Sequence, residues 1–445
     1  MNGSRGVLYL IEEAGIFNNL NNLYQMIRPS VEDGKDVYGL IFMYGCVCAG
    51  TKVWTLDGRN INVETLKKED GIVGYDFEGA TKDLIGTVIE PKEKECLRIT
   101  LSNGNTLECS IDHPILTQII QTHRYDGNKR FREFRDGFIP AKDLKVGSRV
   151  CEARYIDVWG NSTLFDARLV GMLIGDGSYG LNNTPKFSSE DHELLEYIKN
   201  KYEWGLSASH ITKKGKKYED IRIKGICSKL REIGIYGQTK LAKRLPSNYQ
   251  TLNKQSTMEM LGGLYDTDGS IYAKGQCSNI ILTQANKFIL EQIQLLLRKI
   301  GVLSSIVEVK ATIKEGRKDR NNWYNLVIAG RENILNFYMN IELLQEQKKK
   351  KLSDIIEWFS KNPSSKPKGY RDNILVYKIV SIENIGIQTI YNMSAVSSHT
   401  YLANNIITHN TAGDDMSDFT SLQEIMYHPD GYNMEKNDNV WDKEG

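Results

Sequence analysis

The pattern of apolar and polar positions divides the chain into contrasting segments. Residues 46–155 contain short runs in which β-branched and aromatic residues alternate with polar ones, and DG, NG and GN pairs separate these runs. Such alternation predicts short antiparallel strands and few helices. Residues 372–410 show the same alternation. The two segments therefore predict one all-β domain, interrupted by about 200 residues.

The sequence between these segments has a different periodicity and repeats itself. Apolar residues recur at helical spacing in FDARLVGMLIG, TMEMLGGLY and NKFILEQIQLLLRKIG. The series LVGMLIGDGSYG, helix and basic ribbon returns as LGGLYDTDGSIYAKG, helix and basic ribbon, which places Asp176 and Asp268 at equivalent positions 92 residues apart. A single repetition predicts a pseudo-twofold α+β unit, because a solenoid would need more copies.

Charge is unevenly distributed along the chain. The whole sequence has 57 Lys and Arg against 56 Asp and Glu, a net charge of +1. Residues 161–370 contain 33 basic and 22 acidic residues, a net +11, so the remainder carries −10. This asymmetry favours a polyanionic partner for the central block only. On charge alone, a solvated lysine-rich surface explains it equally well.

Composition limits the environment in which the protein is expected to work. The longest apolar stretch, around residues 37–45, is far shorter than the roughly 20 residues that span a bilayer, and the N-terminus lacks the pattern of a signal peptide. We therefore expect a soluble, intracellular protein, located in the cytoplasm. The cysteines are odd in number and show no CxxC spacing, which predicts reduced thiols. They are Cys46, Cys48, Cys96, Cys109, Cys151, Cys227 and Cys277.

The two ends of the predicted β domain carry residues that are able to exchange acyl linkages. Cys46 can attack the preceding carbonyl of Gly45 and convert the amide into a thioester. The Thr411 hydroxyl can then attack this thioester, and the Asn410 side-chain amide can attack its own carbonyl to release the chain. An oxygen-to-nitrogen acyl shift would leave a Gly45–Thr411 peptide. Because little of an unperturbed thiol is ionised at neutral pH, Cys46 needs a base or a strained peptide.

Over residues 46–410, a 365-residue segment, the sequence resembles an intein. The resemblance rests on Cys-x4-Thr at Cys46 and Thr51, SIDHP at 110–114, SSHTYLANN at 397–405 and THNT at 408–411, in the family's order. It implies a horseshoe-shaped, all-β HINT domain that performs self-catalysed protein splicing and needs no cofactor for it.

The resemblance also implies roles for single residues. His113 would weaken the first scissile amide and protonate its nitrogen, a role suited to imidazole. His409 would polarise the Asn410 carbonyl, and His399 would promote cyclisation of Asn410. Ser110 stands where the family usually has Thr, and Asn392 stands where an Asp is common. The second difference removes a carboxylate and leaves the activation of Cys46 open.

Cys48 is a rival for the nucleophile. Excision from residue 46 leaves FMYGTAGDD, whereas excision from residue 48 leaves FMYGCVTAGDD. The first product has a strand that runs into a glycine-rich turn with acids, so Cys46 is preferred and Cys48 is expected to be a buried neighbour.

Each central repeat places an acid at the C-terminal end of a short apolar helix. A carboxylate there faces the negative end of the helix dipole, which is unfavourable unless a cation is present. Glycines in both helices would allow close approach and bring Asp176 and Asp268 together; these are Gly171, Gly175, Gly262 and Gly263. Two carboxylates with nearby carbonyls suit Mg²⁺, which can activate water for strand cleavage.

Residues 165–360 resemble the paired-motif LAGLIDADG homing endonucleases. Two basic ribbons, HITKKGKKYEDIRIKG and EVKATIKEGRKDRNNWYNLVIAG, have the charge and length expected of β-ribbons in a major groove of double-stranded DNA. The resemblance implies one catalytic lysine per repeat, for which we select Lys243 and either Lys349 or Lys350. Each of these lysines taken singly is explained as well by a solvated surface. The two internal repeats predict a monomeric endonuclease that makes no contact with membranes.

The flanking segments have a third composition. LYLIEEA resembles a Walker B strand, with Glu12 at the Mg²⁺ position and Glu13 as the water-orienting acid, and YGTAGDD at the joined flanks resembles the motif that follows it. The likeness is to the large subunit of a phage terminase, a DNA-packaging ATPase, which implies a phage or prophage gene. The sequence has no GxxxxGK[ST], so no ATP hydrolysis is expected of this chain.

These observations predict a multidomain α+β protein. The expected parts are a terminase-like α/β ATPase fragment at 1–45, the two parts of the splicing domain at 46–160 and 371–410, an endonuclease of αββαββα repeats at 161–370, with repeats near 165–250 and 257–360, and a second host fragment at 411–445. We hypothesise self-splicing combined with site-specific, Mg²⁺-dependent cleavage of double-stranded DNA. The alternatives are autoprocessing without ligation, with a degenerate DNA-binding insert, and a terminase ATPase with a passive binding insert.

Overall fold

The computed structural model describes most of the chain between residues 46 and 409. The described residues are 32–33, 36–37, 46–76, 79–83, 85–125, 129–211, 215, 217–310, 322–364, 371–395 and 398–409. The chain forms two compact units, and the part described here assigns residues 46–56, 60–154 and 371–409 to unit 1 and residues 57–59 and 155–364 to unit 2. Within the described part, no helix combines the length and apolar character needed to cross a membrane.

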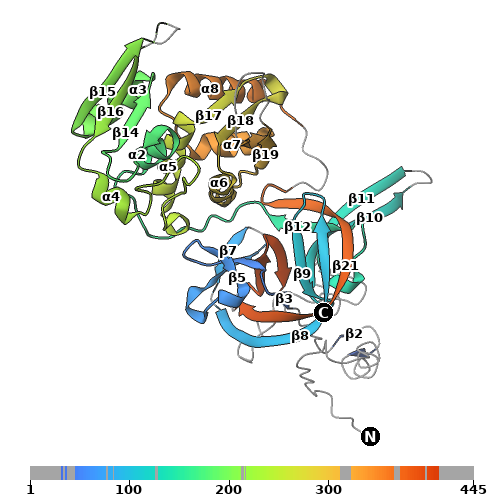
Figure 1. Ribbon diagram of the computed structural model, residues 1–445. Coiled ribbons are helices and arrows are strands. Elements are labelled where there is room, and N and C mark those ends of the chain that lie inside the picture. Colours follow the sequence, from blue (N-terminus) through green and yellow to red (C-terminus); the bar gives the residue numbers. More distant parts are fainter. Residues whose placement is uncertain are drawn as a thin grey trace, which may run out of the picture. The chain divides into compact units, whose positions relative to one another are not determined.

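Unit 1 is built from β-strands, and its described helical turns are short 3-10 segments (Figure 1). The turns are η2 (Val63–Thr65), η3 (Lys68–Asp70) and η4 (Ala141–Asp143). The strands are β3 (Val47–Cys48), β4 (Lys52–Trp54), β5 (Asn60–Asn62), β6 (Ile72–Tyr75), β7 (Ala80–Asp83), β8 (Ile85–Leu101), β9 (Thr106–Ser110), β10 (Pro114–Tyr125), β11 (Lys129–Pro140), β12 (Arg149–Ala153), β21 (Ile374–Ala395), β22 (Thr400–Ala403) and β23 (Ile406–His409). A separate short pair, β1 (Glu32–Asp33) and β2 (Asp36–Val37), precedes them.

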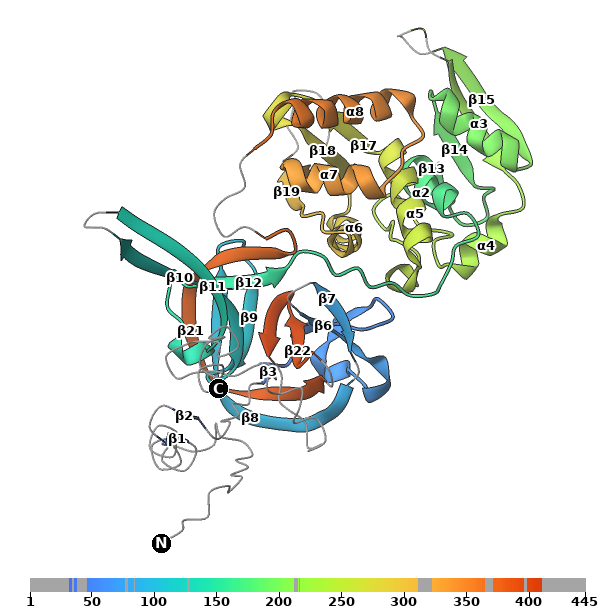
Figure 2. The same cartoon turned by 180° about the vertical axis from the view of Figure 1, so that it is seen from behind.

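The main sheet of unit 1 interleaves strands from the two ends of its sequence. Its order is β11-β10-β23-β12-β21-β3-β9-β8, and β22 pairs with β23. The long strands β8 and β21 also pair with each other, with several register shifts, and both curve around the unit (Figure 2). Gly386, which pairs with Cys96 directly after one of these register shifts, has φ +72°, a conformation that favours glycine. The segments on either side of the insertion are therefore neighbours in one sheet.

Alternation along these strands creates a core between the layers of unit 1. In β9, Leu107 and Cys109 are fully buried, while Thr106 and Glu108 are half-buried. Period-two burial of this kind is what a pleated strand requires, because successive side chains point to opposite faces. The same core also contains Val47, Val53, Ile72, Ile99, Leu101, Ile115, Val150 and Ile406.

Unit 2 contains every α-helix in the described part of the chain, arranged in two similar halves (Figure 1). The first half contains α2 (Ala167–Asp176), β13 (Gly177–Ser178), β14 (Lys186–Ser189), α3 (His192–Lys201), β15 (Trp204–Ile211), β16 (Lys217–Ile223) and α4 (Cys227–Glu232). The second contains α5 (Lys254–Thr267), β17 (Gly269–Tyr272), β18 (Asn279–Gln284), α6 (Lys287–Lys299), β19 (Ser305–Val309), β20 (Trp323–Ala329), α7 (Arg331–Asn340) and α8 (Glu346–Lys361). The 3-10 turns are η5 (Tyr249–Thr251) and η6 (Gly275–Cys277).

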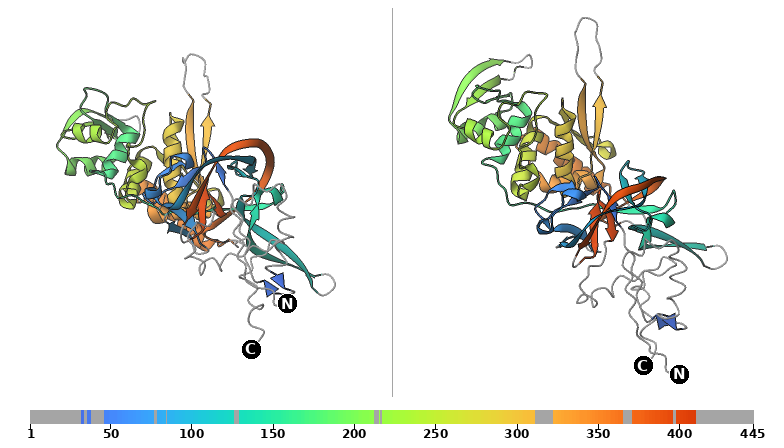
Figure 3. Two further views of the ribbon diagram at one scale, coloured as in Figure 1. Left: turned by 90° about the horizontal axis from the view of Figure 1, so that it is seen from below. Right: turned by 60° about the horizontal axis from the view of Figure 1, so that its bottom comes forward.

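Each half of unit 2 has one four-stranded antiparallel sheet. The orders are β13-β14-β16-β15 and β17-β18-β20-β19, which place the hairpin of the third and fourth strands at the same edge in both halves. Figure 3 shows the β19–β20 hairpin, in gold, extending beyond its neighbouring helices. Both halves follow the order helix, two strands, helix, two strands and helix, and the second half adds α8.

Helices α2 and α5 pack tightly along each other. Asp166 and Asn253 cap their N-termini by accepting hydrogen bonds from Leu169 N and Ser256 N at 2.9 and 2.8 Å. Glycines then permit the approach of the two backbones. A Cβ atom on Gly171 would lie 1.9 Å from Met260 O, and one on Gly263 would lie 2.2 Å from Arg168 O. The close approach expected from these glycines is confirmed.

Candidate active sites

The end of the α2–α5 pair brings together the two repeated acids. Asp176 is the last residue of α2, and Asp268 is the C-cap of α5. A Cβ atom on Gly175 would lie 2.0 Å from Thr267 Oγ1 and 3.3 Å from Asp268 Oδ2, so the two helix ends touch at this point. Gln284, the last residue of β18, donates a hydrogen bond to Asp268 Oδ2 at 2.5 Å.

The electrostatics of this pair favour a cation. Burial raises the pKa of Asp268 to about 6, and the neighbouring charge of Asp176 adds to the increase. Burial also raises the pKa of Asp176, while Lys243 and Lys348 act in the opposite direction. The charge of Asp176 thus disfavours ionisation of Asp268, and a divalent cation between the two carboxylates would relieve this repulsion.

The donor atoms fit a hard divalent cation such as Mg²⁺. Two carboxylates stand beside the backbone carbonyls at the ends of two helices, and oxygen ligands of this kind suit Mg²⁺. In the described part of the chain, no group of three or more His, Cys, Asp or Glu side chains is arranged to hold a metal. A cation held by Asp176 and Asp268 would therefore complete its coordination with water or with oxygens of a bound substrate.

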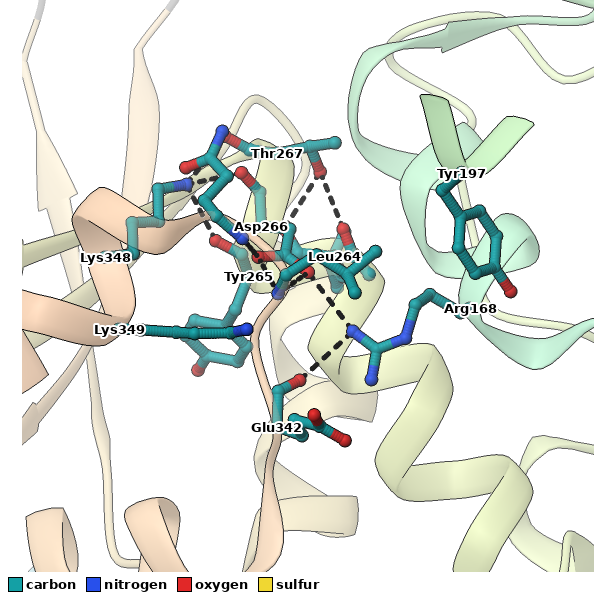
Figure 4. Close-up of polar contacts among 12 residues, drawn as sticks. Arg168, Tyr197, Leu264, Tyr265, Asp266, Thr267, Glu342, Lys348 and Lys349 are labelled. Carbon is teal, nitrogen blue, oxygen red and sulfur yellow. Dashed lines mark hydrogen bonds and ion pairs between the residues drawn. The ribbon is translucent and has the colours of Figure 1, made fainter. Parts of the chain in front are cut away.

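Two lysines, the buried Lys243 and the half-buried Lys348, approach the helix ends that carry these acids. Lys243 Nζ donates to Gly175 O at 2.6 Å, one residue before Asp176. Lys348 Nζ, on α8, donates to the carbonyls of Tyr265 and Thr267 at 2.9 and 3.4 Å, and Figure 4 shows it directed at this end of α5. Burial lowers the pKa of both ammonium groups, while the nearby aspartates act to raise it.

On α8 it is Lys348 that contacts the end of α5, whereas the sequence led us to select Lys349 or Lys350. Lys349 pairs instead with Glu346 at 2.8 Å on the exposed side of α8. Consecutive helical residues are about 100° apart around the axis, so Lys349 points in a different direction from Lys348. Lys243, our selection for the first repeat, contacts the end of α2 through Gly175 O.

Sequence inspection missed Asp266, a carboxylate that is fully buried beside this site. Its oxygens accept a hydrogen bond from Arg168 at 3.2 Å and from the backbone amides of Leu344 and Gln345 at 2.9 and 3.1 Å (Figure 4). These contacts fix the chain immediately before α8, the helix that carries Lys348. The sequence signal was the first aspartate in YDTDG, which we treated as part of the helix before Asp268.

Unit 1 places the predicted nucleophile in a buried, hydrogen-bonded position. Cys46 N donates to Ser110 Oγ at 3.1 Å, and Ser110 N donates to Cys46 O at 2.9 Å. Ser110 ends β9, and its carbonyl accepts a hydrogen bond from His113 N at 3.0 Å. Burial raises the pKa of the Cys46 thiol to about 12. The thiol therefore requires help to ionise at neutral pH.

The three histidines that the resemblance selected lie on segments of unit 1 that meet in the sheet. His113 is fully buried, immediately before β10, with its ring centroid 6.1 Å from that of Tyr401. His399 precedes β22, and its ring stacks on that of His409 at the end of β23, with centroids 6.5 Å apart. His399 has φ +50°, a sparsely populated conformation that is often found at functional sites.

The remaining selected residues have different positions. Asn410 and Thr411 follow His409 and lie outside the described residues, as do the Walker B-like acids Glu12 and Glu13. Asn392 is largely buried in β21, one residue after Tyr391, which pairs with Val47. Cys48 is buried near Cys96, as expected for a neighbour of the nucleophile.

Comparison with known families assigns part of unit 2. Residues 256–342 match the family model described as the LAGLIDADG-like domain. The matched segment begins in α5, contains Asp268 and ends between α7 and α8. Unit 2 therefore contains a LAGLIDADG-like domain.

Curated proteins match this chain over longer segments, but at low sequence identity. The chain is 24% identical over 308 residues to the replication factor C small subunit of Methanocaldococcus jannaschii, which covers 67% of this chain and 15% of that protein. It is 20% identical over 504 aligned positions to the replicative DNA helicase DnaB of Rhodothermus marinus, which covers 94% of this chain and 50% of that protein. The chain thus spans at most half the length of these two relatives.

Solved structures give similarities at low identity. The Ssp DnaB mini-intein is 8% identical, with a TM-score of 0.30, and the match covers 84% of this chain and 99% of that one. A variant of I-DmoI in complex with its target DNA is 15% identical, with a TM-score of 0.26, and the match covers 40% of this chain and 94% of that one.

Proposed function

We propose that unit 2 is an endonuclease that cuts double-stranded DNA at a specific site and depends on a divalent cation. The observation that carries this proposal is the meeting of Asp176 and Asp268 at the touching ends of α2 and α5, within a unit that contains a LAGLIDADG-like domain. When bound, the cation would activate water and stabilise the negative charge that develops at the phosphate.

The side chains around this pair have complementary roles in the proposal. Lys243 and Lys348 place positive charge beside the acids, where it would attract the scissile phosphates. The hairpins β15–β16 and β19–β20 are two-stranded antiparallel ribbons at the edges of the two sheets, and ribbons of this kind are able to enter a major groove. Phosphate contacts along them would give affinity, and base contacts would give specificity.

Replacement of Lys348 by Met is expected to slow DNA cleavage on the order of a hundredfold, because the substitution removes a half-buried positive charge whose field acts on Asp268. Replacement of Lys349 by Met is expected to change the rate by less than about threefold, because an exposed ion pair contributes little. The measurement is the initial rate of linearisation, in Mg²⁺, of a plasmid that encodes residues 1–45 joined directly to 411–445.

The two lysine variants control for each other, since they remove the same charge from neighbouring positions of one helix. Both should retain the thermal unfolding temperature of the parent within a few degrees. Equal loss of activity in both would mean that the lysine cluster acts only through its total charge, and our assignment of Lys348 would then fail.

We propose that residues 46–410 splice themselves out of the chain, with Cys46 as the first nucleophile. The reciprocal hydrogen bonds between Cys46 and Ser110 support this proposal, because they hold the backbone at the start of the segment beside His113. The stacked pair of His399 and His409 supports the same proposal at the other end, because His409 immediately precedes Asn410.

In this reaction the Cys46 thiol attacks the Gly45 carbonyl, and His113 protonates the departing nitrogen. The Thr411 hydroxyl takes over the acyl group, and Asn410 cyclises with the help of His399 and His409. The flanks joined at Gly45 and Thr411 would belong to a phage terminase large subunit, encoded by a phage or prophage and made in the cytoplasm of its host cell.

Expression of the full chain, followed by mass spectrometry, is expected to give a free 365-residue protein and a joined 80-residue flank product. Cys46→Ala should abolish both products, because alanine offers no nucleophile, whereas Cys277→Ala should leave both unchanged, because Cys277 is an exposed thiol of unit 2. Separate flanks without a joined product would favour autoprocessing without ligation. An intact chain in all three proteins would refute both reactions.

A further inference from the structure

An ion pair lies next to the predicted nucleophile of unit 1. Lys94, on β8, and Asp112, in the turn between β9 and β10, approach within 3.6 Å between Nζ and Oδ2. Their side chains are only 13% and 6% exposed. Cys46 is 6% exposed and interacts electrostatically with both. A thiol, a carboxylate and an ammonium group are therefore buried near one another.

The bonding of Asp112 is unusual for a buried carboxylate. Both of its oxygens are inaccessible to solvent, and no hydrogen bond from the described residues reaches either of them. Lys94 at 3.6 Å supplies charge but not a hydrogen bond. A buried carboxylate with so few partners opposes folding, since the attraction within a buried ion pair seldom exceeds the cost of removing both charges from water. The arrangement therefore calls for a functional explanation, and such groups concentrate at active sites.

The backbone around Cys46 fixes this geometry. In the antiparallel β8–β9 ladder Cys96 pairs with Ser110. Lys94 lies two residues before Cys96 and Asp112 lies two residues after Ser110, so both lie beyond the same end of this pair. Ile111 N donates to Glu95 O at 3.2 Å, which extends the pairing toward Asp112. Because Ser110 also binds the backbone of Cys46 at both its N–H and its C=O, the ion pair and the thiol are held by the same residues.

The two charges act on the thiol in opposite directions. Lys94 favours the thiolate, whereas Asp112 disfavours it. Burial dominates both, and with a pKa of about 12 only roughly one thiol in 10⁴ would be ionised at pH 8. A base is therefore needed at the moment of attack. Asn392, at the position where the resemblance leads us to expect an acid, has no carboxylate to serve as that base.

We propose that Asp112 is the base that takes the proton from Cys46, and that Lys94 stabilises the resulting thiolate. This inference rests on the proposed splicing function. The Sγ–H proton moves to the Asp112 carboxylate, the bond from Sγ to the Gly45 carbonyl carbon forms, and the bond from that carbon to Cys46 N breaks. His113 protonates the nitrogen, and the proton held by Asp112 then replaces the one that His113 has given up. No net proton or electron is consumed.

The inference predicts that loss of Asp112 changes the rate of thiol labelling and the rate of chain cleavage in opposite directions, whereas loss of Lys94 lowers both rates. The test uses the full chain with Asn410→Ala and Thr411→Ala, which stops the reaction after the first step. Hydroxylamine then releases the first 45 residues at a rate set by thioester formation, and iodoacetamide labelling of Cys46 between pH 7 and pH 9 reports thiol ionisation. Buried Cys151, also in unit 1, serves as the internal reference for local opening.

Lys94→Met is expected to slow both labelling and hydroxylamine cleavage by about tenfold, because the thiolate loses its nearby cation. Asp112→Asn is expected to speed labelling by about threefold, because a negative charge beside the thiol is removed. The same variant should slow cleavage by tenfold or more, because the base is lost. Asp112→Glu keeps a carboxylate and should restore part of the cleavage rate. A purely structural role of Asp112 would shift labelling and cleavage in the same direction in Asp112→Asn.

The other ionisable groups that surround Cys46 stay constant in all these variants. They are Cys96 on β8, Cys109 on β9, His113 before β10 and Tyr401 on β22. The ion pair of Arg98 and Glu108, which is more exposed than that of Lys94 and Asp112, joins the same two strands and provides the matched control. Arg98→Met and Glu108→Gln should leave both rates within about twofold of the parent, since exposed pairs are weak.

The outcomes are distinguishable. If Asp112→Asn accelerates both labelling and cleavage, the carboxylate only suppresses ionisation, and its role as base is overturned. If neither variant alters Cys46 labelling, the ion pair does not act on the thiol, and the inference fails. If the parent releases no fragment in hydroxylamine, the proposed splicing function fails, while the labelling rates still decide whether Lys94 and Asp112 control the thiol.

Discussion

Replacement of Asp176 or Asp268 by Asn should lower the rate of DNA cleavage on the order of a thousandfold, because either change removes one of the two carboxylates proposed to bind the cation. Asn preserves the volume of the side chain, so the packing of α2 against α5 should persist. The measurement is the initial rate of plasmid linearisation in Mg²⁺, with the same plasmid as for the lysine variants.

Measurement of DNA binding distinguishes a loss of catalysis from a loss of the folded structure. In EDTA, both Asn variants should bind the target at least as tightly as the parent, since a negative charge near the phosphates is lost. Asp354→Asn, an exposed acid on α8, is the matched control and should cut at the parental rate. Parental cleavage by Asp176→Asn or Asp268→Asn would exclude this site as the catalytic centre.

The dependence of DNA cleavage on pH gives a second test of Asp176 and Asp268. The pKa of Asp268 is raised to about 6 by burial and by Asp176, so its ionised form declines as the pH falls through that value. A divalent cation binds the ionised form and competes with the proton. The Mg²⁺ concentration for half-maximal cleavage should therefore rise below about pH 6 and stay nearly constant above it.

Gly171→Ala is expected to destabilise unit 2 by about 3 kcal/mol, although two effects of opposite sign act on it. Alanine is favoured over glycine inside a helix by about 1 kcal/mol. Against this, the new Cβ atom would lie 1.9 Å from Met260 O, so the backbones of α2 and α5 must separate. We expect the steric term to dominate, because the opposing atom belongs to the backbone and cannot rotate away.

Thermal unfolding of the full chain tests this prediction. A loss of about 3 kcal/mol corresponds to a decrease of roughly 6–12 °C in the transition of unit 2. Gly205→Ala, on β15, is the matched control, because an added Cβ atom there meets nothing within 4 Å. A higher transition temperature for Gly171→Ala would mean that helix propensity dominates and that the contact between α2 and α5 is not tight.

Local sequence patterns predicted most of the secondary structure of both units. The alternation in residues 46–155 corresponds to the strands of unit 1, and the helical spacing around LVGMLIGDG and LGGLYDTDG corresponds to α2 and α5. These patterns were informative because burial on one face imposes a period of two on a strand and 3.6 on a helix. The internal repeat added the equivalence of Asp176 and Asp268, which no single motif would have justified.

The choice among neighbouring residues was beyond such patterns. Lys348 and Lys349 have the same chemistry, and the position of α8 around its axis decides which of them reaches the end of α5. Asp266 and Asp268 are equally plausible ligands in YDTDG, but Asp266 turns toward Arg168 and the amides before α8. A difference of one or two residues in a helix changes the direction of a side chain by about 100° or 200°.

The amino-acid sequence by itself determined the periodicity of the strands and helices, the duplicated acid-bearing helix and the concentration of positive charge in the central block. It did so because these properties depend on residues that are close together along the chain. Only the tertiary structure decided that Lys348 joins the two acids, that Asp266 supports α8, and that Lys94 and Asp112 enclose Cys46. These decisions depend on how strands and helices from distant segments pack, which fixes the direction of each side chain.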